Sequence, residues 1–376
     1  MPGSITRGIV FFILSATSLM SCASAFAAAQ GFGWDLSYKQ DFLRDVAGGK
    51  ERGGGAPGML EADGAWRWGS SEFKIGLLGT FGGSLYKRVG ALQPPSDLKA
   101  YNTLKLYKLW YGHRFGQTGL ALRLGVQDYS ALFNTLAAAQ IFMNTSFGVA
   151  PTISQVHPSI YPVTALGAVL HWQAHHVYAL GGIYDGVPGL PGHPAGTHIE
   201  LRSGDGTFSN VEAGIIGKGY KLGVGGWYRT TDFKDMLGEP YDRNHGFYIV
   251  GSKMLFGGGG KPTLDVFVQL GSAEEDRNEM GRYIGAGVEL QHFISGRPND
   301  ALGLGMARVL PSDLFQRATP GVTRPETVFE ATYQAAISKS LVIHPDVQYI
   351  TNPGAVPDYD NAWVVGFRLQ YQMQGG

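Results

Sequence analysis

The stretch from Ser295 to Val309 reads SGRPNDALGLGMARV and decides the fold. It begins with loop residues, because Pro and Gly interrupt regular structure and Asn and Asp bond their own backbone. From Leu302 onward, large apolar residues occupy every second position, and Gly or Ala stands between them. This period of two predicts a β-strand. The second face of this strand carries only Gly and Ala instead of polar side chains. Such a strand suits a curved or crowded wall, where another group lies close to the backbone.

The composition narrows the class of protein. The chain has 376 residues, 56 of them Gly, and only 16% are charged, compared with about 25% in a typical soluble protein. The formal net charge is zero, so nothing indicates a nucleic-acid partner. After the N-terminus no apolar run reaches the roughly 18 residues that a transmembrane helix needs. Strands of a membrane β-barrel would leave almost no such hydropathy signal.

Residues 1–29 have the pattern of a secretory signal peptide. Arg7 precedes the apolar run at 8–14, and small residues follow at 23–29 with an A-x-A-like end. We therefore expect residues 30–376 to form a single mature domain. The alternative is a lipoprotein box ending at Cys22. Because Cys22 is the one cysteine of the chain, we expect no disulfide in the mature protein.

Many other stretches alternate in the same way. One face is apolar, and the other carries Gly, Gln and isolated charges; examples are 120–127, 220–229, 264–270, 286–291, 329–335, 341–349 and 363–371. A soluble β-sandwich could also bury such apolar faces. Aromatic residues near strand ends and the length of the unbroken strand series favour an outer-membrane barrel instead. The sequence predicts an all-β fold, a closed antiparallel transmembrane barrel of about 16 strands.

Residues 134–162 break the alternation. The segment contains Pro151, Pro158 and Pro162 and has no regular period. Long loops without regular structure are usually functional. We expect this loop to fold into the lumen of the barrel and narrow it.

The sequence offers no convincing catalytic or cofactor motif. Gly258–Lys261 fails as a phosphate-binding loop, because Leu255 and Pro262 occupy the positions where that motif needs Gly and Ser or Thr. The cluster at His171, His175 and His176 fits a solvated strand end. A metal at His193, His198 and Glu200 is an alternative to a solvated loop. We predict no enzyme activity, no cofactor and no metal site.

The polar face of the strands predicts the lining of a pore. Sugars are bound by aromatic rings and by side chains that bond hydroxyl groups, and charges of opposite sign that nearly balance favour neutral polar solutes. For each residue the alternative is a structural role within the wall. The predicted pore-lining residues are Arg123, Gln127, Trp227, Arg229, Gln269, Glu289, Glu330, Asp346, Gln348 and Arg368.

Several motifs resemble the carbohydrate-selective porins of bacterial outer membranes, the OprB type. They are GRPNDALGLG at 296–305, FMNTSFGVAP at 142–151, GGWY at 225–228 and PDVQYITNPG at 345–354. The resemblance implies an outer-membrane barrel, monomeric or weakly associated, that passes glucose and related sugars. It also implies Arg123 and Trp227 as sugar contacts. We expect insertion into outer-membrane lipid by the barrel-assembly machinery.

The sequence departs from this family at two places. Gly112 and His113 stand where family members often carry an acid and an amide, which bears on sugar selectivity. The chain ends Gln374-Gly375-Gly376 rather than on an aromatic residue, so Tyr371 would serve as an internal assembly signal.

Two other functions remain open from the sequence. One is a non-conducting scaffold barrel linked to polysaccharide export. The other is a secreted soluble β-protein with sugar-binding activity. Recovery from the periplasm without detergent would identify the soluble protein, and single-channel conductance would distinguish a channel from a scaffold.

Overall fold

The computed structural model describes residues 30–376. The predicted signal peptide at 1–29, with Cys22, lies outside these residues. The sixteen long strands are β1 (Gly31–Gly49), β3 (Gly58–Trp68), β4 (Ser71–Phe81), β5 (Thr103–Arg114), β6 (Leu120–Gln127), β7 (Ala165–Ala174), β8 (Val177–Asp185), β9 (Thr207–Gly217), β10 (Tyr220–Arg229), β13 (Asn244–Gly258), β14 (Lys261–Ala273), β15 (Met280–Gln291), β16 (Ala301–Pro311), β17 (Glu326–Ala336), β18 (Leu341–Thr351) and β19 (Asp360–Gly375).

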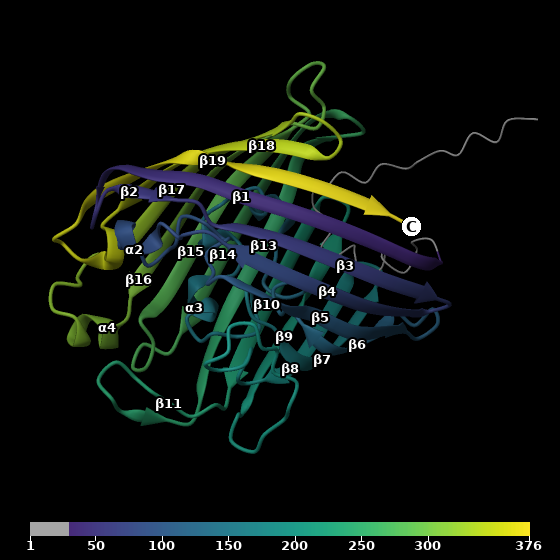
Figure 1. Cartoon of the computed structure of the whole chain (residues 1–376), viewed down its shortest axis with the longest axis horizontal. Helices are drawn as coiled ribbons and strands as arrows, with labels where there is room; N and C mark the ends of the chain where they lie inside the picture. Colours follow the sequence, from purple (N-terminus) through teal and green to yellow (C-terminus); the bar gives the residue numbers. More distant parts are fainter. Residues whose placement is uncertain (1–29) are drawn as a thin grey trace, which may run out of the picture.

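These strands form one closed antiparallel barrel (Figure 1). Consecutive long strands pair along the chain, and β1 closes the ring because it pairs with β19 on one side and β3 on the other. The three-residue β2 (Gly53–Gly55) also pairs with β1. The predicted all-β, 16-stranded barrel is therefore confirmed.

The remaining elements are short and lie between the long strands. They are α2 (Tyr86–Val89), η1 (Ala137–Ala139), η2 (Thr145–Phe147), α3 (Pro151–Ser154), α4 (Asp313–Ala318), η3 (Pro353–Ala355) and the small hairpin of β11 (Phe233–Lys234) and β12 (Pro240–Tyr241). Among the described residues, no helix is both long and apolar enough to span a membrane.

The two ends of the barrel differ in the length of their connections. At one end, residues 82–102, 128–164 and 186–206 connect β4 to β5, β6 to β7 and β8 to β9. At the other end, two-residue turns at 175–176 and 218–219 connect β7 to β8 and β9 to β10. Long loops are typical of the extracellular end of outer-membrane barrels and short turns of the periplasmic end.

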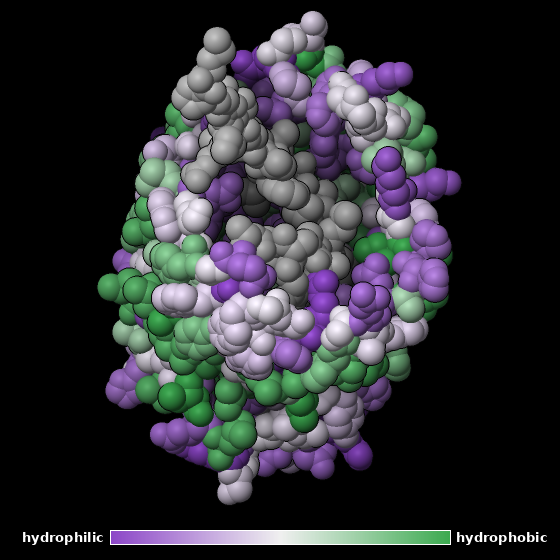
Figure 2. Space-filling view, turned by 90° about the vertical axis from the view of Figure 1, so that its right-hand side faces the viewer, coloured by the Kyte–Doolittle hydropathy of each residue, from purple (hydrophilic) through white to green (hydrophobic). Residues whose placement is uncertain are grey.

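Figure 2 views the molecule from the short-turn end, where the C-terminus lies in Figure 1. Hydrophilic side chains gather along parts of the rim, and hydrophobic side chains form patches on the outer flank. Exposed aromatic residues lie at strand ends here; Trp66 and Trp68 precede the turn after β3, and Trp172 precedes the turn after β7. Such rings are typical of the interface between lipid and water.

The Gly-rich strand β16 explains the alternation that opens the sequence analysis. Leu304 points outward and is exposed, whereas Gly303 and Gly305 face the lumen. A Cβ on Gly303 would lie 2.8 Å from the Ile141 side chain, and one on Gly305 would lie 2.7 Å from Phe142. The small face of β16 is therefore the surface against which the lumen loop packs.

The outward face of β19 provides a test of this orientation. Phe367 lies near the middle of β19, is 41% exposed and stacks on Phe42 of β1 with 5.1 Å between ring centroids. We expect Phe367→Arg to impair assembly, because an arginine at mid-bilayer costs about 2–4 kcal/mol. Heat-modifiable mobility on gels measures the folded fraction.

Gln372→Arg is the matched control on the same strand. Gln372 faces inward and its Nε2 donates to Asp35 at 2.8 Å, so an arginine there gains an acidic partner and should assemble normally. Equal tolerance of both substitutions would contradict the orientation of β19.

Candidate functional site

Loop 128–164 carries its own apolar core into the lumen. Phe133, Phe142, Met143 and Phe147 are all buried, in contact with inward-facing side chains of the barrel. The ring of Phe142 lies 4.3 Å from that of Phe147 and 5.6 Å from that of Phe267 on β14, measured between centroids. Buried aromatic rings contribute strongly to the stability of a packed core. The loop is therefore held in place inside the lumen, where its apolar core packs against β8–β17. We call this packed core the apolar filling.

Polar side chains of the wall bond the backbone of the same loop. The Glu330 carboxylate on β17 accepts the N–H groups of Met143, at 2.5 Å, and Asn144, at 3.1 Å. On β14, the Gln269 amide donates to the Phe147 carbonyl at 3.1 Å. Irregular backbone leaves N–H and C=O groups without partners in its own segment. The wall supplies these partners.

A second loop, 82–102, enters the lumen beside the first. The Glu326 carboxylate accepts the N–H groups of Leu92 and Gln93, both at 2.8 Å. Gln348 on β18 joins the two loops, since its amide donates to the Pro95 carbonyl at 2.8 Å and accepts from the Asn144 side chain at 3.1 Å. The two loops are therefore held to the wall as one unit.

The wall formed by β3, β4 and β5 carries paired charges, next to a small apolar cluster in which its buried residues Met59, Leu78 and Tyr107 pack with the two loops. Asp63 accepts from Lys74 at 2.7 Å and from Lys108 at 3.0 Å, and Lys108 also contacts Glu61. The Lys108 side chain is 21% exposed. Nearby, Arg67 pairs with Glu72 at 3.0 Å. Each of these charges has a partner of opposite sign, so the group is polar without a strong net field. Lys105, also on β5, is buried and its ammonium nitrogen has no hydrogen-bond partner.

Arg123 on β6 lies beside this charged wall. Its guanidinium carbon is 4.2 Å from the centroid of the Trp110 ring on β5, within the range of a cation–π contact. Trp110 pairs with Gly125 across the two strands. Gly125 has φ of +131°, and a Cβ there would lie 2.2 Å from the Leu109 carbonyl oxygen, so glycine is required for this close approach.

Five predicted pore-lining residues contact loops or loop ends. Gln269, Glu330 and Gln348 do so as described above. Arg229 donates to the Gly186 carbonyl at 3.3 Å. Arg368 bonds Asp41 at 2.6 and 2.9 Å and also contacts Asp97 of loop 82–102.

The other predicted residues lie at different places on the inner face. Gln127 donates to the Gly167 carbonyl of β7 at 3.1 Å, and Asp346 accepts from Gln348 at 2.9 Å. Glu289 is buried on β15. Trp227 is 2% exposed and stacks on Phe208, with 6.2 Å between centroids. A direct sugar contact at Trp227 stays a prediction.

The sequence analysis missed the charged wall, including Glu61, Asp63, Lys74 and Lys108. An irregularity in the pairing of β4 with β5 explains part of this, because Gly76 pairs with Lys108 but Leu77 pairs with Leu106. Such a bulge interrupts the period of two. Tyr107 and Lys108 therefore both make inward contacts, to Asp128 and Glu61. Glu61 and Asp63, two residues apart between small or apolar neighbours, were a usable signal.

One group among the described residues has the ligand types of a metal site, namely Asp185, His198 and Asp205. It lies where loop 186–206 meets β8 and β9. Of the residues that the sequence analysis considered as metal ligands, His193 and Glu200 are exposed in the same loop, and Glu200 pairs with Arg202 at 2.7 Å.

The chain is similar to known porins. The family model described as carbohydrate-selective porin, OprB family, matches residues 60–373. Porin B of Pseudomonas aeruginosa is 25% identical over 184 residues, 40% of either chain. The putative porin QuiX of Acinetobacter baylyi is 23% identical over 250 residues, 56% of either chain. The matches thus span about half the length of these curated relatives.

Solved structures show the same barrel fold. The high-pH structure of Pseudomonas putida OprB has a TM-score of 0.79 at 18% identity, and the match covers 91% of this chain and 94% of that one. A loop-deletion mutant of the outer-membrane protein OmpT of Vibrio cholerae has a TM-score of 0.51 at 12% identity, covering 91% and 98%.

The attachment of the lumen loop to Glu330 gives a prediction. We expect Glu330→Ala to raise the single-channel ion conductance and its noise while the barrel still folds. The substitution leaves two buried N–H groups without their acceptor, at about 1–3 kcal/mol each, so the loop loses its fixed position. Planar-bilayer recordings measure the step size.

Glu289→Ala is the control for this experiment. It removes another buried carboxylate of the wall, one whose polar neighbours are Gln291 of its own strand and Asp265 on β14. Its step size should stay near that of the parent protein. The same conductance increase in both variants would show that lost negative charge, and not loop release, is the cause.

Proposed function

The chain belongs to the carbohydrate-selective porins of the OprB family, and from that premise we propose that it passes sugars across the outer membrane by passive diffusion. It is an integral barrel of that membrane, and the porin family indicates a channel rather than an enzyme. The observation that carries the proposal is the division of the lumen between an apolar filling and a wall of paired charges.

The solute path in this proposal runs along β3–β6. The apolar core of loop 128–164 occupies the contacts with β8–β17, so a solute on that side would have to displace buried rings. The charged wall instead keeps partly exposed side chains, such as Lys108 and Lys74. These groups offer hydrogen-bond donors and acceptors to a hydrated solute.

The chemistry of this wall fits neutral sugars better than ions. Carboxylates of Glu61 and Asp63 can accept from sugar hydroxyls, and the ammonium groups of Lys74 and Lys108 can donate to them. The pairing of opposite charges keeps the field weak for a passing ion. Contacts must stay weak, because conduction requires a solute to leave as well as to enter.

Arg123 is the predicted sugar contact that adjoins this path. It pairs across the strands with Gly112, where family members often carry an acid. The Arg123 guanidinium lies over the face of the Trp110 ring. We assign the direct recognition of a sugar to Arg123 and Trp110.

In this proposal most of the other predicted pore-lining residues hold the loops in place and do not contact the sugar. Gln269, Glu330, Gln348 and Arg368 hold the loops that set the width of the path. Trp227 on the wall stacks on Phe208 and in this way supports the apolar filling. The pore partners are small carbohydrates, the surroundings are outer-membrane lipid, and the assembled protein is a monomer or weak homo-oligomer inserted by the barrel-assembly machinery.

Liposome swelling with a panel of solutes tests the function. We expect glucose to enter faster than a neutral non-sugar solute of similar size, and Arg123→Ala to reduce this ratio several-fold, since about 1 kcal/mol of lost contact is roughly a fivefold change. Arg123→Lys keeps the charge but loses the planar donors and should fall between. Absence of any swelling would favour the scaffold barrel, and an unchanged ratio in Arg123→Ala would remove Arg123 from the site.

Substitutions at Trp227 distinguish support of the apolar filling from direct contact with the sugar. If Trp227 supports the filling, Trp227→Phe should keep the sugar ratio near that of the parent, because an aromatic ring still packs on Phe208. Trp227→Ala should lower the ratio and raise ion conductance, since deleting a buried Trp costs about 3–5 kcal/mol. A full loss of the sugar ratio in Trp227→Phe would show direct contact instead.

A further inference from the structure

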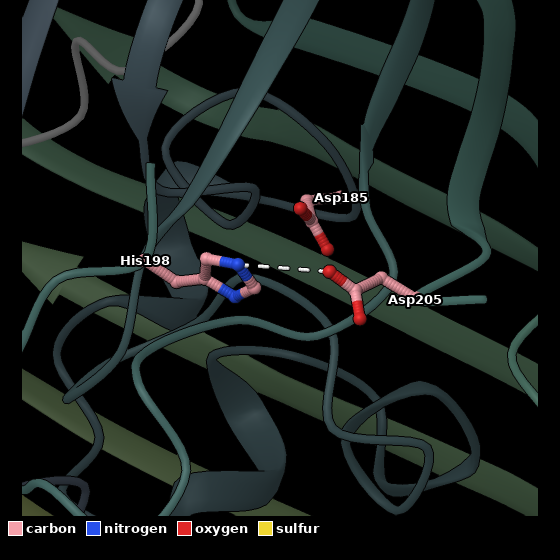
Figure 3. A group of neighbouring side chains, drawn as sticks. All are labelled: Asp185, His198 and Asp205. Atoms are coloured by element: carbon pink, nitrogen blue, oxygen red, sulfur yellow. Dashed lines mark ion pairs between the residues drawn. The ribbon is translucent and has the colours of Figure 1, made fainter. Parts of the chain in front are cut away.

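Three side chains converge where loop 186–206 joins the barrel (Figure 3). Asp185 is the last residue of β8, His198 lies within the loop, and Asp205 stands two residues before β9. One ligand atom from each lies within 4.8 Å of the other two. The segment 186–206 thus brings together groups that are far apart along the loop.

The hydrogen bonds around this cluster fix which atoms face one another. The His198 Nδ1 lies 3.1 Å from the Val187 carbonyl oxygen. A carbonyl only accepts, so Nδ1 carries a proton, and in the neutral imidazole Nε2 then presents its lone pair to the cluster. The Asp185 Oδ1 accepts the Val187 N–H at 2.8 Å, which leaves Oδ2 for the cluster. This arrangement is typical of metal-binding histidines, whose second nitrogen donates to a carbonyl or carboxylate.

The facing atoms have no protein hydrogen-bond partner. Asp185 Oδ2, His198 Nε2 and Asp205 Oδ2 are all buried and unbonded. Asp185 is 4% exposed and His198 3%, and the Asp205 side chain is 20% exposed. Burial of polar atoms without a partner is costly. Two carboxylate oxygens and an imidazole lone pair together can be satisfied by a cation.

The distance within the cluster fits two ligands of one metal ion, and with a protonated His198 it also fits the ion pair drawn in Figure 3. His198 Nε2 and Asp205 Oδ2 are 3.6 Å apart, beyond hydrogen-bond range. Two ligands held about 2.0–2.2 Å from a tetrahedral zinc ion are roughly 3.4 Å from each other. The observed separation is therefore close to one edge of such a coordination shell.

We propose that Asp185, His198 and Asp205 form a site for one divalent transition-metal ion of the zinc type. An imidazole nitrogen suits zinc, copper, iron and nickel, whereas calcium and magnesium prefer a shell of oxygen ligands. Each of the three residues supplies one ligand atom, and water completes the shell. The sequence analysis predicted no metal, because it paired His198 with His193 and Glu200 rather than with residues at the two ends of the loop.

The site fastens a loop that covers an open sheet edge. β6 pairs with β5 only at Leu109–Arg114, so the start of β5 has no strand partner on that side. Loop 186–206 covers it, since Thr197 Oγ1 donates to the Leu106 carbonyl at 2.5 Å and Thr103 Oγ1 to the Pro194 carbonyl at 2.8 Å. An uncovered edge is unfavourable in a barrel wall. The metal ties this loop to β8 and β9.

Zinc titration of the untagged, folded protein in detergent tests the site. We expect one tight equivalent of Zn²⁺ per chain in calorimetry, lost in both His198→Ala and Asp205→Asn and kept in His193→Ala, the exposed histidine of the same loop. A large excess of Ca²⁺ or Mg²⁺ should not displace it. A parent protein without this equivalent, its survival in His198→Ala, or displacement by Ca²⁺ would each overturn the proposal.

Limited trypsin digestion gives a second readout that does not depend on permeation. Arg202 is the sole Lys or Arg between 186 and 206, and its side chain is 59% exposed. Saturating Zn²⁺ should slow cleavage after Arg202 by about tenfold or more, because binding depopulates the open loop. The protection should vanish in folded His198→Ala. Cleavage that is independent of Zn²⁺ in the parent protein would overturn the role in fastening the loop.

Discussion

The lumen depends on the hydrogen bonds that join the barrel wall to the backbone of the loops inside it. Glu330 accepts two N–H groups of loop 128–164, and Glu326 accepts two of loop 82–102. Irregular backbone is tolerated at membrane depth only when protein or water satisfies its polar groups. A carboxylate offers several acceptor sites at once, so one side chain can hold a turn of backbone that no helix or sheet would pair.

This attachment makes the lumen asymmetric. The bonded loop places its aromatic side chains against β8–β17, where Phe267 and the small face of β16 receive them. The opposite wall keeps its ion pairs, such as Lys74 with Asp63. A closed barrel of this size would otherwise enclose a wide aqueous channel. In the proposed function, the loops reduce that space to a path that has the polar groups of β3–β6 on one side and the apolar core of loop 128–164 on the other.

The barrel was predictable because membrane strands repeat a simple rule. The alternation from Leu302 to Met306 correctly put Leu304 on one face and Gly303 and Gly305 on the other, and in the structure the first face points outward and the second toward the lumen. The same rule could not show which inward side chains meet a loop, because Gln269 and Glu289 both appear simply as polar residues facing inward. Their difference depends on where residues 128–164 lie after folding. The pairing shift opposite Gly76 also breaks the period on which the reasoning relied.

The rate at which a water-soluble thiol reagent modifies single cysteines most directly tests where the solute path runs. The chain has one natural cysteine, Cys22, so introduced thiols report alone in a Cys22→Ala background. Lys108→Cys on the charged wall should react rapidly and the modification should block ion current. Val328→Cys, which is buried beneath the apolar filling, should react far more slowly. Equal rates at the two positions, or block from Val328→Cys alone, would contradict a path along β3–β6.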